Sequence, residues 1–171
     1  NLELISEAFG FGTEAITTNA DAHTSTIADG ATDPIRAIFI KYTGTLDSAC
    51  TITIGPNTVN KFCFIHNATS GSQSIIISQG SGANVTIATG QTKGVYLDGA
   101  GSGAAVVDAF ATLSVVDLLV DDDLTVTDDA AIGGDLSVTG GVAVTGDYSS
   151  ATSGTSNLRL GVNAGNSIAS G

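Results

Sequence analysis

A six-residue repeat in the last third of the chain constrains its fold more than any other feature. From residue 117 the sequence reads, in register, DLLVDD, DLTVTD, DAAIGG, DLSVTG, GVAVTG and DYSSAT. The second and fourth positions of these lines are mostly aliphatic, and the first is mostly Asp. Two successive dodecads, DLTVTDDAAIGG and DLSVTGGVAVTG, differ only by conservative changes over much of their length. The pattern indicates a true internal repeat.

Each line of the repeat predicts a short strand followed by a corner. An apolar-x-apolar triplet places both apolar side chains on one face of a strand, and the Gly, Thr and Asp that follow favour a turn. Burying two such side chains contributes roughly 3–6 kcal/mol, whereas ordering the backbone costs about 1–2 kcal/mol per residue. Because a single chain cannot offset that cost alone, we expect three chains to share one apolar axis. The repeat therefore predicts a trimeric β-helical or β-prism shaft over residues 114–152.

The predicted core of this shaft is the set of aliphatic side chains at the second and fourth positions. These residues are Leu118, Val120, Leu124, Val126, Ile132, Leu136, Val138, Val142 and Val144. A single-chain hexapeptide solenoid is the structural alternative. Such a solenoid usually has a small residue two places before the large aliphatic one, where this chain has Leu118, Leu124 and Leu136. The trimeric shaft is therefore favoured.

The residues before the repeat predict an all-β domain. The chain is 42% hydrophobic but only 13% charged, so Thr, Ser, Asn and Gly must supply most of its polar surface. No window keeps a 3.6-residue apolar period, and turn signals separate short β-prone runs. Such spacing is typical of an antiparallel β-sandwich or jelly-roll-like domain, here over residues 24–113. Its expected strands are residues 35–42, 50–54, 61–66, 74–78, 84–88, 94–97 and 104–110.

The net charge limits the kinds of partner, and the positions of the cysteines indicate their state. A formal net charge of −12 argues against nucleic acid and anionic membranes, which attract clustered Lys and Arg. No apolar run is long enough to span a bilayer, so we expect no membrane insertion. The acidity indicates a soluble surface, or alternatively docking onto a basic partner. Cys50 and Cys63 lie in strand-like runs and are expected to be small buried hydrophobes rather than a disulfide.

No arrangement of residues predicts catalysis or a cofactor. His23 and His66 have no context that would make either a general base, and the glycine runs lack the strand, Lys and helix of a phosphate-binding loop. The Asp runs at residues 121–123 and 128–129 lack the spacing of a calcium loop, so solvated corners are favoured over a cation site. We therefore expect a protein that is not an enzyme and that needs no cofactor or metal. Two glycosylation-type triplets begin at Asn67 and Asn84.

The first segment, residues 1–23, concentrates apolar side chains where strand-pairing signals are few. In an isolated domain such a segment would be a frayed end, whereas in a fibre it would order against a partner. The candidate docking residues are Leu2, Leu4, Ile5, Phe9 and Phe11. At the other end, residues 153–171 are expected to begin a further Asn- and Gly-rich repeat region in which the chain stops in mid-pattern.

The run DLTVTDDAAIGGDLSVTGGVAVTG resembles the shaft repeats of tail fibres from marine podoviruses of the T7-like, cyanophage type. KYTGTLDSACTITIGPNTVNKFCFIHNATSG and GVYLDGAGSGAAVVDAF are similar to segments of such phage proteins, and TSNLRLGVNAGNSIASG is similar to head-type repeats of trimeric adhesins and fibres. The resemblance covers most of residues 40–171. It implies a homotrimeric structural protein of the virion. Its amino-terminal part would dock on tail adaptor and nozzle proteins, and a distal tip would bind the host receptor.

Related architectures stay open at this point. A phage head fibre and the stalk or head segment of a trimeric bacterial surface adhesin carry similar shafts. An upstream signal peptide and a downstream outer-membrane barrel would identify the adhesin. A glycan-degrading tailspike would need a long parallel β-helix with carboxylate pairs on one face, for which this segment has no room.

Overall fold

The computed structural model describes residues 2–146, and the chain divides into two units at Leu118. Within the described residues the regular structure is mostly strand with little helix, which confirms the all-β prediction. The helical elements are α1 (Leu2–Ala8), η1 (Pro34–Arg36) and η2 (Gly101–Gly103). The strands are β1 (Phe11–Ala15), β2 (Ala22–Thr26), β3 (Phe39–Thr43), β4 (Cys50–Gly55), β5 (Lys61–Asn67), β6 (Ile75–Ser78), β7 (Val85–Ile87), β8 (Thr92–Leu97) and β9 (Val106–Asp108).

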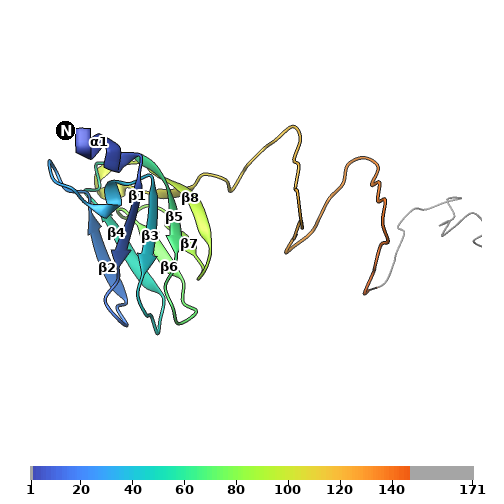
Figure 1. The fold of residues 1–171 in the computed structure, drawn as a ribbon, viewed down its shortest axis with the longest axis horizontal. Helices are drawn as coiled ribbons and strands as arrows, with labels where there is room; N and C mark the ends of the chain where they lie inside the picture. The colour runs from blue at the N-terminus through green and yellow to red at the C-terminus, as the bar shows by residue number, and fades with distance from the viewer. Residues whose placement is uncertain (1, 147–171) are drawn as a thin grey trace, which may run out of the picture. The chain divides into compact units, whose positions relative to one another are not determined.

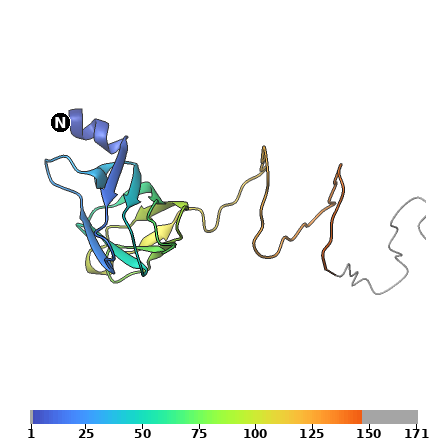
Figure 2. The same ribbon diagram turned by 60° about the horizontal axis from the view of Figure 1, so that its bottom comes forward.

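The strands of the first unit form two sheets that the chain visits alternately. One sheet has the order β1-β3-β5-β8-β9 and the other the order β2-β4-β6-β7. β1, β3 and β5 each lead to a strand of the opposite sheet, so the first six strands make three successive turns of chain (Figure 1). Strands in successive turns pair in parallel, and β7, β8 and β9 then close the sheets with antiparallel pairs. Figure 2 shows the same winding from a second direction.

The mixed sheets differ from the antiparallel sandwich or jelly roll expected from the sequence. Four of the strand pairs, β1–β3, β3–β5, β2–β4 and β4–β6, are parallel. The physical reason is that alternation of buried and exposed residues reports one buried face but carries no strand direction. Turn signals mark where strands are connected, but they do not say whether the next strand lies in the same sheet. The connections from β1 to β2, β3 to β4 and β5 to β6 carry the chain to the other sheet.

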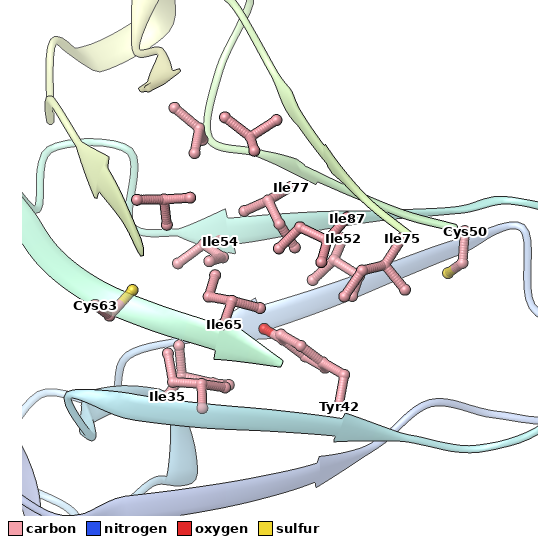
Figure 3. Close-up of a cluster of buried hydrophobic side chains, with 14 of the residues drawn as sticks. Ile35, Tyr42, Cys50, Ile52, Ile54, Cys63, Ile65, Ile75, Ile77 and Ile87 are labelled. Carbon is pink, nitrogen blue, oxygen red and sulfur yellow. The ribbon is translucent and has the colours of Figure 1, made fainter. Parts of the chain in front are cut away.

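The core lies between the two sheets and consists largely of isoleucine. Ile40 from β3, Ile52 and Ile54 from β4 and Ile65 from β5 are buried in one cluster. Figure 3 shows Ile52, Ile54 and Ile65 pointing into this shared interior. Alternation sends every second side chain of these strands inward, and β-branched residues suit that pleated surface. Burial of these side chains, at roughly 1.5–3 kcal/mol each, is the main stabilising contribution to the unit.

A buried amide fixes the corner after β5. The side chain of Asn67 donates from Nδ2 to the carbonyl oxygens of Gln73 and Ile87, each at 3.0 Å. Its Oδ1 accepts from the backbone N–H of Thr69 at 3.1 Å and from the Thr69 hydroxyl at 2.6 Å. Gly71 follows at φ +97°, and a Cβ there would lie 1.8 Å from the carbonyl oxygen of Leu46. The first glycosylation-type triplet is therefore an internal brace, with its asparagine buried.

Residues 109–146 contain no helix or strand in the described part of the chain. Their side chains are almost all exposed, including the aliphatic positions of the hexad repeat. The predicted shaft over residues 114–152 falls mostly on this stretch, with its last residues outside those that the structure describes. The predicted Asn- and Gly-rich region at residues 153–171 lies wholly outside them.

Candidate interaction surfaces

The ionisable groups inside the first unit link its elements to one another. His23 Nε2 of β2 lies 2.6 Å from Glu14 Oε1 of β1, which joins the two sheets. Lys61 donates to three backbone carbonyl oxygens, those of residues 35–37. Among residues 2–146 no three His, Cys, Asp or Glu side chains lie where they could share a metal ion. These groups hold elements of the fold together, and the candidate sites of interaction lie on its surfaces.

Both cysteines occupy the buried positions that the sequence predicts. Cys50 begins β4 and Cys63 lies in β5, and both are free thiols with no exposed surface. Burial, partly opposed by the nearby Lys61 ammonium, raises the pKa of the Cys63 thiol to about 11. Burial also raises the pKa of Cys50, with a further contribution from the Asp21 carboxylate. Because a thiol must lose its proton to act as a nucleophile, neither is suited to reaction at neutral pH.

The docking residues predicted in the first segment do not all lie on one surface. Leu2, Ile5 and Phe9 lie on and just after α1, and each is well exposed. Their spacing of three and then four residues places them on one helical face. Leu4 is half-buried. Phe11 is separate from this face because it lies in β1 and pairs with β3.

Polar contacts hold α1 against η1 while its apolar face stays exposed. Glu7 Oε1 accepts from the backbone N–H of Asp33 at 2.8 Å, and Glu7 Oε2 accepts from Arg36 Nε at 3.1 Å. Asp33 in turn accepts from the backbone N–H of Arg36 at 2.7 Å and so caps η1. These charge-assisted hydrogen bonds position α1 without burying any of its residues.

The predicted shaft core is the second exposed apolar surface. Its nine residues are all exposed, from Val120 at 39% to Leu118 and Leu136 at 67%. No described residue of the chain covers them. Since a soluble protein rarely leaves so many large aliphatic side chains in water, this row is a candidate surface for association.

The third surface is an aromatic strip on the outer face of the five-stranded sheet, which the sequence analysis missed. It consists of Phe11, Phe39, Phe62, Phe64, Tyr96 and Phe110. Parallel pairing aligns Phe11 with Phe39 and Phe39 with Phe64. The sequence does contain a signal for this alignment, because Phe recurs at the start of FGTEA, FIKYT and FIHNA.

The rings of the strip contact one another in two geometries. Phe11 and Phe39 are stacked with their centroids 5.5 Å apart, and Phe64 and Phe110 are stacked at 6.4 Å. Phe62 meets Phe64 edge to face, at 5.3 Å and an interplanar angle of 82°. The strip therefore exposes ring edges and ring faces together, and aromatic pairs favour both contacts.

A shallow hollow of about 350 Å³ lies at the β8 end of the strip. Phe64 and Phe110 line it together with Gly94, whose missing Cβ leaves room for Phe110 because a Cβ would lie 2.5 Å from that ring. The ion pair between Lys93 Nζ and Asp108 Oδ2, 3.0 Å apart, also borders the hollow. The hydrogen bonds to Lys93 and Phe110 hold the pKa of Asp108 below its ordinary value, the Lys93 bond contributing most.

Comparison with known proteins does not assign the chain to a class. No protein-family model, curated protein or solved structure matches it. Among the helices that the structure describes, none has the length and apolar character needed to cross a membrane.

Proposed function

We propose that this chain is a structural segment of a homotrimeric phage tail fibre, of the kind carried by T7-like marine podoviruses. In this proposal the protein is part of the virion, its role is mechanical rather than catalytic, and it binds no nucleic acid. The amino-terminal part attaches the fibre to tail adaptor and nozzle proteins. A distal tip, beyond this segment, contacts the host receptor. The exposed aliphatic row of the hexad repeat carries the proposal.

The row supports a trimer because its apolar side chains recur at a fixed spacing and need a partner at every level. Leu124 and Val126 of one line are followed by Ile132, and then by Leu136 and Val138. All are exposed in the single chain. Two further copies would supply apolar neighbours at the same heights, because identical chains carry the same repeat in the same register. A trimeric shaft also removes open strand edges.

The apolar face of α1 supports the proposed anchor. Leu2, Ile5 and Phe9 have the i, i+3, i+7 spacing by which amphipathic helices bind apolar grooves. The contacts of Glu7 with Asp33 and Arg36 hold the helix in place. Because the helix is already formed before binding, a partner would bind it with little loss of conformational entropy.

Analytical ultracentrifugation of residues 1–171 over a wide range of dilution tests the trimer. We expect a single species of three chains. Far-UV circular dichroism should show additional strand signal in the trimer relative to a variant that lacks residues 114–171. A monomer with an ordered carboxyl-terminal half at every dilution would overturn the proposal.

Particle assembly tests the anchor. The triple substitution Leu2→Ser, Ile5→Ser, Phe9→Ser should leave the sheets folded and abolish incorporation of the fibre into virions. A matched variant with Thr17→Ala, Thr18→Ala and Thr24→Ala changes exposed residues away from α1 and should incorporate normally. Virions with normal fibre numbers in the Ser variant would place the attachment site elsewhere.

A further inference from the structure

We propose that the aromatic strip is the surface through which the amino-terminal units of three copies of this chain pack against one another. The inference rests on the proposed trimer and extends it from the shaft to the mixed-sheet unit. The strip is defined by Phe11, Phe39, Phe62, Phe64, Tyr96 and Phe110.

The two outer faces of the unit differ in a way that the fold does not require. On the four-stranded sheet, the exposed strand positions include Thr24, Thr26, Thr53 and Thr86. On the five-stranded sheet, outward positions such as Thr13, Lys41 and His66 are polar, but five others carry aromatic rings: Phe11, Phe39, Phe62, Phe64 and Tyr96. Thr and Phe both suit strands, so strand formation does not explain the difference. Exposed apolar patches on soluble proteins mark interaction sites, and aromatic residues are enriched in protein interfaces.

Electrostatics favours this face as the one at which identical chains meet. Each chain carries a formal charge of −12, so most approaches between copies are repulsive. The outward residues of β1, β3, β5 and β8 include no Asp or Glu. At the end of the strip, Asp108 is neutralised by Lys93 at 3.0 Å. The strip is therefore a face on which acidic copies can approach without opposing carboxylates.

The exposed aliphatic row follows the strip in the sequence, and this order favours a second copy of the chain as the partner. The strip ends at Phe110, and the backbone N–H of Leu113 donates to the Phe110 carbonyl oxygen at 3.1 Å. Leu113, Val115 and Val116 follow within the same unit and are exposed. Once the hexad repeats of three chains associate, covalent linkage keeps their strips at high effective concentration. Ring edges and faces on each copy then find complementary faces and edges on the next.

Site-specific photocrosslinking in the full 171-residue chain tests the inference directly. Benzoylphenylalanine replaces Phe62 in one variant and, as the matched control, replaces Thr86 on the opposite sheet in another. After irradiation, denaturing gels should show covalent dimers and trimers for position 62 and far fewer for position 86. Equal yields at the two positions, in a chain that still sediments as a trimer, would overturn this inference and leave the proposed trimer standing.

A paired substitution supplies a second measurement. Phe62 and Tyr96 are cross-strand partners, and the change Phe62→Thr, Tyr96→Thr keeps residues that suit strands. We expect the midpoint of trimer dissociation to shift to about tenfold higher concentration or more, because aromatic side chains dominate interface energies. Thr53→Ala, Thr86→Ala is the control and should leave the midpoint unchanged. If the Phe62→Thr, Tyr96→Thr variant has an unchanged midpoint, this inference alone is overturned. A wild-type chain that is always monomeric would overturn the proposed function and this inference together.

Discussion

The hydroxyl of Tyr42 in β3 donates a hydrogen bond of 3.0 Å to the Oγ of Ser25 in β2, and this bond joins the two sheets through the core. Both residues are buried, and desolvation raises the pKa of the Tyr42 hydroxyl far above its ordinary value. Tyr42 therefore keeps its proton and acts as a donor. Figure 3 shows its ring among the isoleucines of the core.

Removing this donor should destabilise the unit more than removing a similar hydroxyl from the surface. Tyr42→Phe leaves the Ser25 oxygen buried without its partner, and we expect a loss of about 1–2 kcal/mol in the free energy of unfolding. Urea denaturation followed by circular dichroism measures it. Thr86→Val is the control because Thr86 carries an exposed hydroxyl on the outer face of the four-stranded sheet. If the two variants lose equal stability, the bond between the sheets contributes nothing.

The two glycosylation-type asparagines offer a matched pair of a different kind. Asn67 is buried and makes the four hydrogen bonds of the corner after β5, whereas Asn84 is exposed. Asn67→Ala removes all four bonds and leaves the buried N–H of Thr69 without its acceptor, although Thr89 still donates to the Gln73 carbonyl oxygen. We therefore expect a loss of about 2–4 kcal/mol in the free energy of unfolding. Asn84→Ala should change it by less than about 0.5 kcal/mol. Similar losses at both positions would contradict the role assigned to Asn67.

The positions of strands could be predicted from the sequence because alternation and turn residues are local. The seven expected strands from residue 35 onward correspond to β3–β9, with ends that differ by a few residues. The same reasoning could not predict two features. Strand direction depends on which distant segments pair. The strand β1 is short and contains Gly12, whose missing side chain lets Pro34 approach, so its sequence does not resemble a typical strand. α1 has too few residues for its apolar spacing to stand out from the segment around it.

The candidate surfaces were predictable to different degrees. The exposure of the aliphatic row in a single chain follows from the repeat itself, since one line buries too little to fold alone. The aromatic strip depends on parallel pairing, which brings Phe11, Phe39 and Phe64 into alignment across three strands. Strand spacing and turn signals could not predict the strip, whereas aligning FGTEA with FIKYT and FIHNA would have done so.

The buried thiol of Cys63 predicts a pH dependence of stability in the alkaline range. Burial raises its pKa from the ordinary 9.0 to about 11 in the folded protein. Between these values the unfolded chain has released the proton and the folded chain has not, so the free energy of unfolding falls as pH rises. The loss contributed by this thiol is about 1.4 kcal/mol per unit of pH across that window.

Comparing variants isolates the contribution of the thiol. Cys63→Ala should lose stability less steeply than the wild type between pH values of about 8.5 and 10.5, by a total of about 2 kcal/mol. Val95→Ala is the control, because Val95 is the buried cross-strand partner of Cys63 and does not titrate. Urea denaturation at each pH gives the slopes. A Cys63→Ala slope equal to those of the wild type and Val95→Ala would mean that the thiol has an ordinary pKa.

Neighbouring residues of the repeat give the sharpest test of the shaft. In the single chain Leu136 and Ser137 are both exposed, so a monomer would tolerate Asp at either position. The hexad register of a trimer places Leu136, with Val138, on the shared axis and Ser137 on the opposite face. Leu136→Asp would then bring three carboxylates together in an apolar interior, where each must take up a proton or force the strands apart. We expect Leu136→Asp to abolish trimer formation and Ser137→Asp to be nearly silent, by thermal unfolding and sedimentation measured side by side. Equal effects at the two positions would mean that the register, and the shaft built on it, is wrong.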